Sequence, residues 1–156
     1  MSDLQNYLQD SSRESLISEV REKINTLGVE AIYYQYISIT GRIMGKTVPS
    51  RHWERLANEG MQTWLGGVTN VFADKEGDLI GFEPNASELL ALPDPDTFCQ
   101  LPWNKKLARV FCTVFFSRED PRRAEEFLDS DSRGNLRRIH AQFERDHGLR
   151  LRVGCE

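Results

Sequence analysis

Three side chains near the end of the sequence have the spacing of metal ligands. His140, Glu144 and His147 stand at i, i+4 and i+7, so a helix would place them on one face. Imidazole and carboxylate groups arranged in this way can bind zinc. A histidine with a glutamate one helical turn away is more often a solvated polar pair, and we favour that interpretation. A zinc-binding helix remains the alternative.

Arg109 is a charged residue inside an apolar, β-prone run, residues 107 to 116. A buried arginine is costly unless it is paired with an acid. The side chain is therefore expected either to face water at a sheet edge or to form part of a site. Both interpretations stay open from the sequence.

An acidic cluster follows that run, and it is interleaved with basic residues at helical spacing, which predicts a solvated face of ion pairs. Its acidic members are Glu119, Asp120, Glu125, Glu126, Asp129 and Asp131, and its basic members are Arg118, Arg122, Arg123 and Arg133. The chain has no Gly-x-Ser-x-Gly, Walker or Gly-x-Gly-x-x-Gly motif, so it lacks the local signatures of hydrolases and nucleotide-binding folds. No catalytic residue is assigned to it.

Residues 60 to 85 predict a long loop, because they hold six glycines or prolines and few periodic apolar residues. Trp64 and Leu65 place two large apolar side chains beside Gly66 and Gly67. Long loops inside small domains tend to be functional or disordered. The bulky side chains favour a loop that contacts another molecule.

The composition describes one water-soluble domain. The chain has 156 residues, of which 39% are hydrophobic and 28% charged, and it has no apolar run near the length of a membrane helix. Its net charge of -4 disfavours nucleic acid as a partner. The first residues do not resemble a secretory signal, and three cysteines without Cys-x-x-Cys spacing argue against disulfides and thiolate zinc sites. We expect a cytoplasmic protein that binds no membrane.

The first half of the chain predicts a helix followed by a hairpin. Residues 1 to 10 show no hydrophobic periodicity, so we predict a frayed tail there. An apolar stripe from 16 to 27, after a Ser-x-x-Glu capping box at 11 to 14 and before Gly28, predicts a helix over 12 to 27. The tyrosine-rich run from 31 to 39 and the shorter run from 43 to 48 predict a β-hairpin.

The second half supplies the rest of an α+β fold. A short helix capped by Ser50 is expected to lie over the hairpin, and the strand at 107 to 116 is expected to pair with 31 to 39 at the sheet centre. Helices are predicted at 119 to 128 and from Ser132 to Gly148, followed by a strand at 149 to 153. The order predicts a β-grasp-like mixed sheet with an N-terminal helix, followed by two helices and a strand.

The order of several short motifs resembles the beginning of a glutamine synthetase family chain. The strand and Gly-containing turn from Tyr33 to Pro49 match the opening of that family's β-grasp domain. Residues 87 to 94, Ser-Glu-Leu-Leu-Ala-Leu-Pro-Asp, match the strand before its Leu-x-Pro-Asp turn, and residues 102 to 112 match Pro-Trp followed by an Ala-Arg-Val strand. The helix that begins at Ser132 leads to Gly154-Cys155-Glu156, which matches the start of its Gly-x-Glu-x-Glu motif.

The resemblance implies a domain division and a metal ligand. Residues 1–28 would be a tail and helix, 29–117 the β-grasp domain, and 118–156 the beginning of a truncated catalytic domain. Glu156 would be a ligand of a divalent ion, Mg²⁺ or Mn²⁺, that bridges ATP and glutamate. The longer parent would join an amine to the γ-carboxylate of glutamate through a γ-glutamyl phosphate.

The resemblance also implies a partner. Family active sites form between neighbouring subunits of a ring-shaped homo-oligomer, and the loop at Trp64, Leu65, Gly66 and Gly67 would contact the substrate or the neighbouring subunit. Members that use ammonia carry Asp-Gly-Ser-Ser in this loop. Here the matching position is Leu65 or near it, and the first acid is Asp74. An apolar loop suits an amine larger than ammonia.

Taken alone, this portion is expected to be inactive and to bind neither ATP nor metal tightly, because it lacks the second glutamate of the motif. The alternative is a free-standing β-grasp interaction module without catalytic activity.

Overall fold

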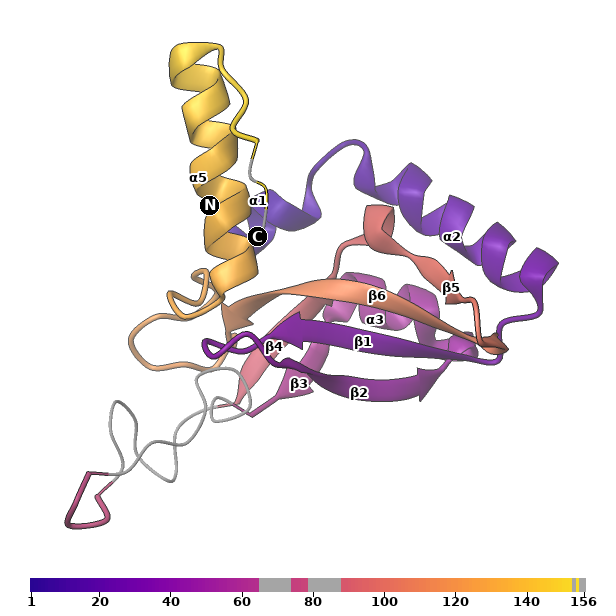
Figure 1. Cartoon of the computed structure of the whole chain (residues 1–156), viewed down its shortest axis with the longest axis horizontal. Coiled ribbons are helices and arrows are strands. Elements are labelled where there is room, and N and C mark those ends of the chain that lie inside the picture. Colours follow the sequence, from indigo (N-terminus) through magenta and orange to yellow (C-terminus); the bar gives the residue numbers. More distant parts are fainter. Residues whose placement is uncertain (65–73, 79–87, 153, 155–156) are drawn as a thin grey trace.

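The computed structural model describes residues 1–64, 74–78, 88–152 and 154. Figure 1 shows a curled sheet with helices on both of its faces and one helix rising from one end. The helices are α1 (Asp3–Leu8), α2 (Arg13–Leu27), η1 (Ser50–His52), α3 (Trp53–Glu59), η2 (Pro95–Thr97) and α5 (Ser132–His147). The strands are β1 (Ala31–Ile37), β2 (Ile43–Pro49), β3 (Met61–Thr63), β4 (Leu89–Pro93), β5 (Cys99–Leu101) and β6 (Asn104–Phe116).

The sheet is mixed and has the order β2-β1-β6-β4-β3, with β5 added to β6. β1 and β6 are parallel, with Ala31 opposite Leu107 and Gln35 opposite Phe111. The other pairs are antiparallel. The α+β class, the hairpin and the central pairing of the tyrosine-rich strand with residues 107 to 116 are therefore confirmed.

One face of the sheet carries the main core, which α2 and α3 cover together. Ile17, Val20 and Ile24 are the buried residues of the predicted α2 stripe, and Gly28 ends the helix with a φ of 65°. Trp53 is fully buried and donates from Nε1 to the Ile17 carbonyl at 2.9 Å. This bond ties the two covering helices to each other.

The other face is covered at one end by α1, so the predicted frayed tail is wrong. Ser2 forms a capping box with Gln5, and Leu4 is fully buried in a cluster with Leu92 and Phe115. Burial of Leu4 stabilises this six-residue helix, which local sequence preferences alone would not stabilise.

The expected capping box of α2 is also wrong, because the helix is capped at Ser12 and the Ser12 side chain makes no capping hydrogen bond.

Residues 119 to 128 form turns and a β-bridge, so the helix predicted there is wrong. The Asp120 carboxylate accepts from the backbone N–H groups of Arg122 and Arg123, which fixes a turn, and Glu125 has a φ of 64°. Phe127 then bridges to Phe115 on β6. Pairing with β6 gives the N–H and C=O groups of this segment more stable hydrogen bonds than a short isolated helix would.

The last helix, α5, is confirmed, but Asp131 caps it in place of the predicted Ser132. The buried Asp131 carboxylate accepts from Gly134 N at 3.0 Å and from Val114 N at 2.9 Å. A Cβ on Gly134 would lie 2.4 Å from that carboxylate, so this position requires glycine. The strand predicted at 149 to 153 is not observed, because residues 149–152 form no strand and Val153 lies outside the described residues.

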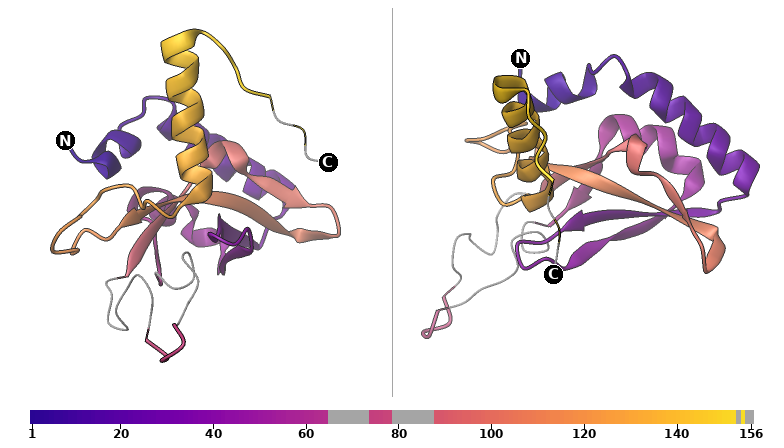
Figure 2. Two further views of the ribbon diagram at one scale, coloured as in Figure 1. Left: turned by 60° about the vertical axis from the view of Figure 1, so that its left-hand side comes forward. Right: turned by 45° about the horizontal axis from the view of Figure 1, so that its top comes forward.

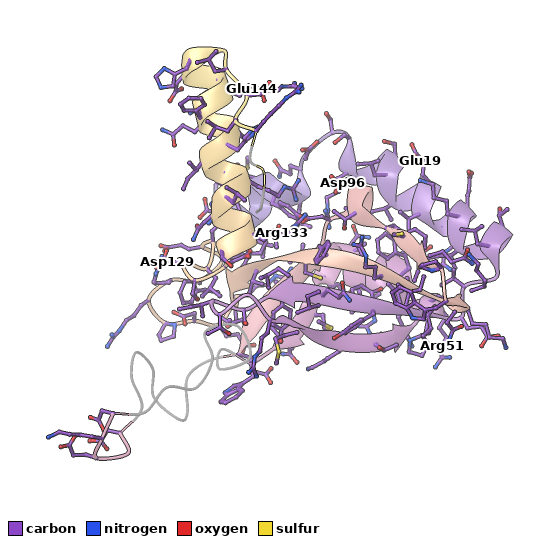
Figure 3. The ribbon with its side chains drawn as sticks, in the orientation of Figure 1. Glu19, Arg51, Asp96, Asp129, Arg133 and Glu144 are labelled. Atoms are coloured by element: carbon purple, nitrogen blue, oxygen red, sulfur yellow. The ribbon has the colours of Figure 1, made fainter. Side chains whose placement is uncertain are left out.

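Asp94 is the centre of a buried polar cluster that joins α1, β6 and α5 to the β4–η2 turn. Its carboxylate is 2% exposed and accepts from the Tyr7 hydroxyl, from Thr113 Oγ1 at 3.1 Å and from Arg133. Arg137 Nη1 lies 2.6 Å from the same carboxylate. Burial and the nearby Asp94 charge raise the pKa of Tyr7, so its hydroxyl remains a donor. This Asp94 cluster fixes where α5 leaves the sheet, and Figure 3 labels its member Arg133 at the start of that helix.

Substituting Asp94 by asparagine should lower the free energy of unfolding by about 3 kcal/mol, because two arginines lose their buried partner. Urea unfolding followed by circular dichroism measures the loss. Asp96→Asn is the matched control, since that side chain is exposed two residues away and its change should be within about 0.5 kcal/mol. Equal losses in the two variants would contradict this account of α5.

Candidate functional site

Three strands end at the same edge of the sheet. β6 is parallel to β1 and antiparallel to β4, and β4 is antiparallel to β3, so β1, β3 and β6 all run in one direction. Their last residues are Ile37, Thr63 and Phe116. We call this the loop edge of the sheet, and Figures 1 and 2 show the connections after β1 and β6 leaving from it. Connections gathered at a common strand end are where rigid scaffolds commonly carry binding residues.

The loop edge exposes large apolar side chains. Ile39 is 53% exposed, Ile43 is 55% exposed and Trp64 is 48% exposed. A hollow of about 270 Å³ lies at the same edge between β3, β4 and the segment after β6, and it includes Gln62, Glu88 and Arg118. Apolar side chains grouped at one edge are typical of a contact surface.

Hydrogen bonds hold the last strand before the loop firmly to the hairpin. The Tyr36 hydroxyl lies 2.7 Å from Thr63 Oγ1 in a buried position, and Lys46 Nζ donates to the Gln62 carbonyl at 3.0 Å. Arg118 Nη1 donates to the Glu59 carbonyl at 3.1 Å and so braces the helix before β3. The point at which the chain enters the loop is therefore fixed.

Of the predicted site residues, only Trp64 is described, and it lies directly after β3 at the loop edge. Leu65, Gly66, Gly67 and the predicted metal ligand Glu156 lie outside the described residues. The roles of these residues stay predictions.

The alternative zinc site on α5 gains no support from the geometry. Glu144 forms an ion pair with Arg150, and the His147 ring packs on Phe143 with centroids 4.9 Å apart. Within the described ranges, no group of three His, Cys, Asp or Glu side chains could hold a metal ion.

Arg109 does not lie at a sheet edge, because at this position β6 pairs with β1 on one side, opposite Tyr33, and with β5 on the other, opposite Cys99. The side chain is half-buried, and its guanidinium lies 4.7 Å from the centroid of the Phe111 ring. Packing on an aromatic ring accounts for how a strand interior holds this charge.

The acidic cluster after β6 is largely the predicted face of ion pairs. Arg123 lies 2.7 Å from Glu126 and also pairs with Asp129, and Arg118 lies 3.7 Å from Glu125. Asp131 departs from the prediction, since it is buried and caps α5.

The buried Cys112 is no candidate nucleophile, because desolvation raises the pKa of its thiol.

The chain is similar in sequence to curated proteins of one family. The chain is 28% identical over 143 residues to a glutamine synthetase of Methanococcus maripaludis, covering 90% of this chain and 30% of that protein. It is 21% identical to human Lengsin, covering 78% of this chain and 26% of that protein. The resemblance to the glutamine synthetase family is confirmed. The chain spans less than a third of the length of these relatives.

Solved structures confirm the fold. GmaS in complex with ADP matches with a TM-score of 0.60 and 23% identity, covering 84% of this chain and 26% of that chain. GmaS without ligand matches with a TM-score of 0.59 and 22% identity, covering 79% of this chain and 25% of that chain. No family model matches the sequence.

Sequence reasoning missed the carboxylates that organise the second face. Asp94 stands between two prolines, and Asp131 precedes a glycine by three residues. An aspartate three residues before a glycine, as at Asp131 and Gly134, is typical of a helix N-cap whose carboxylate lies close to the backbone of the first turn. This pattern could have been recognised in the sequence. The donors to Asp94 come from residues 7, 113 and 133, which no local pattern connects.

Two tyrosines on β1 give a matched test of how β3 is held. Tyr36→Phe removes the bond to Thr63 and should cost about 1 kcal/mol of stability, with faster amide exchange in β3. Tyr34 is also buried, but within the part of the chain that the structure describes its hydroxyl has no hydrogen-bond partner. Tyr34→Phe should therefore be neutral or stabilising, and calorimetry with hydrogen exchange compares the two. A larger loss in Tyr34→Phe would overturn the assignment.

Proposed function

We propose that the chain is the N-terminal portion of a glutamine synthetase-like, ATP-dependent ligase that joins an amine to the γ-carboxylate of glutamate. The observation that carries the proposal is the loop edge, a fixed scaffold with exposed apolar side chains at the start of the predicted contact loop. The relatives named glutamine synthetase support a ligase as the parent. In this proposal residues 29–117 are the β-grasp domain and residues 118–156 begin the catalytic domain.

The loop edge fits a role in completing a neighbouring subunit's pocket. Ile39 and Ile43 flank the hairpin turn, and Trp64 opens the loop from the adjacent part of the edge. A contact surface of this kind buries apolar side chains around a loop that enters the partner. The partner in this proposal is the next subunit of a ring-shaped homo-oligomer, to which Trp64, Leu65, Gly66 and Gly67 would be directed.

The described residues do not by themselves fit the metal and nucleotide of such a ligase. They contain no group of acids, histidines or cysteines that could hold a divalent ion. No reaction step is therefore assigned through Mg²⁺, Mn²⁺ or ATP in this chain. Glu156 stays the proposed ligand, to be completed by residues that this sequence does not contain.

The preferred amine is proposed to be larger than ammonia, because the loop carries Trp64 and Leu65 where an ammonium-binding carboxylate would be expected. An ammonium ion needs a negative partner to replace its hydration, whereas an alkyl group gains from apolar contact. The ligase proposal does not depend on this choice of amine.

The enzyme extended beyond Glu156 should form γ-glutamyl amides, and faster with methylamine than with ammonia. A coupled-enzyme assay of ADP release, run with each amine, measures the two rates. If no amine supports turnover, the ligase proposal fails. Equal rates with both amines would remove only the proposed amine preference.

Leu65→Asp in the extended enzyme should shift the ratio of kcat/KM toward ammonia by about tenfold, equivalent to roughly 1.4 kcal/mol. Leu65→Asn is the matched control, since it changes size and polarity without adding charge. A shift of equal size in the asparagine variant would show that the charge is not responsible.

The 156-residue chain itself is expected to bind neither Mg²⁺ nor ATP tightly. Its Tm should therefore not rise when both are added, whereas a ligand that bound the folded state tightly would raise the Tm by mass action. A thermal-shift scan with ATP alone, Mg²⁺ alone and both together measures this. A rise of several degrees with both ligands would contradict the expected inactivity of this portion.

A further inference from the structure

A hollow of about 460 Å³ lies where the connection from α1 to α2 meets the end of α3. Figure 1 shows this connection arching between the two helices. The walls of the hollow include two apolar side chains and three charged ones, which are Leu8, Ile17, Asp10, Arg13 and Glu14. None of these residues belongs to the loop edge, so the hollow is a separate feature of the molecule.

Arg13 is a buried cation without a carboxylate partner. It is 6% exposed, and within the described residues it takes part in no ion pair. Its Nη2 donates to the Ala57 carbonyl at 2.6 Å, and its guanidinium lies 4.6 Å from the centroid of the Tyr7 ring. Its buried Nε has no hydrogen-bond partner in the same part of the chain. A buried charge is costly unless a counter-charge compensates it, and an anionic group in the hollow would supply one.

The start of α2 offers hydrogen-bond donors beside Arg13. The first N–H groups of an α-helix have no acceptor within the helix, and the positive end of the helix dipole attracts anions. Ser12 stands at the N-cap, but its hydroxyl donates to Asp10 Oδ1 at 2.7 Å and does not cap the helix. The N–H groups of the first turn are therefore placed to donate to the same anionic group that Arg13 attracts.

The hollow also carries negative charge, which disfavours a ligand that is only an anion. Asp10 and Glu14 are both exposed, and Arg13 is the only cation among the described residues that line the hollow. Hydrogen bonds from Ser12, and to a smaller extent the charge of Arg13, lower the pKa of Asp10, so this side chain is a carboxylate at neutral pH. These two acids would repel a lone anion. A ligand with an ammonium beside its carboxylate would instead pair with both signs.

We propose that this hollow binds a free α-amino acid with an aliphatic side chain. The carboxylate of the ligand meets Arg13 and the first turn of α2. Its ammonium meets Asp10 and Glu14, and its aliphatic side chain lies against Leu8. The two charges of such a ligand match the two signs of charge in the hollow, and its apolar part matches the apolar wall. The site does not depend on the ligase proposal.

Nuclear magnetic resonance titration of the isotope-labelled chain with L-valine tests the proposal. The backbone amide signals of Glu14 and Ser15 and the Nε–H signal of Arg13 should shift saturably. Isovalerate lacks the ammonium of valine and isobutylamine lacks its carboxylate, so each should bind at least about tenfold more weakly. The absence of a saturable shift at these signals with valine up to about 10 mM overturns the proposal, as does equal binding of either control ligand.

Two variants separate the charges at the site. Asp10→Asn keeps an oxygen that can accept from Ser12 but removes the negative charge, so valine should lose most of its advantage over isovalerate. Arg13→Gln should weaken the binding of both ligands, and circular dichroism shows whether this buried substitution still folds. If it does not, Asp10→Asn decides the proposal alone. Glu22→Gln is the exposed control on the same helix and should leave valine binding unchanged. A full preference for valine in Asp10→Asn would show that the proposed ligand class is wrong.

Discussion

The parallel pairing of β1 with β6 is the constraint on which the rest of the fold depends. Two parallel neighbours cannot be joined by a tight turn, so a long connection must carry the chain back to the start of the second strand. Here the connection includes β2, α3, β3, β4 and β5, and β4 lies antiparallel on the side of β6 opposite β1. That order turns β3 back into the direction of β1 and β6. The loop edge follows directly from these strand directions.

The elements that sequence reasoning predicted are those whose partners lie in a periodic pattern. Ile17, Val20 and Ile24 bury one side of α2 at helical spacing, and the tyrosine-rich strand packs on a face that α2 and α3 cover. The hydrophobic periodicity of each segment is sufficient to predict that it has an apolar face. Long β-branched and aromatic runs also identified both central strands, since few other segments can occupy a sheet centre.

Tertiary contacts overrode local preference where the predictions were wrong. Leu4 has only Tyr7 and Leu8 at helical spacing, which is too short a pattern to predict a stable helix, and α1 forms because Leu92 and Phe115 provide a place to bury Leu4. The segment from 119 to 128 has helical spacing of charges, but its backbone instead bonds to β6, as Leu128 N does to the Val114 carbonyl at 3.0 Å. A single sequence cannot show that such a partner strand lies within reach.

The buried carboxylates determine how α5 is placed relative to the sheet. Asp131 fixes where α5 begins, and the Asp94 cluster fixes its direction relative to β6. A helix joined to the sheet by a short surface turn alone would swing, but one held by buried ion pairs keeps its angle. The loop edge and α5 therefore keep a fixed relative position.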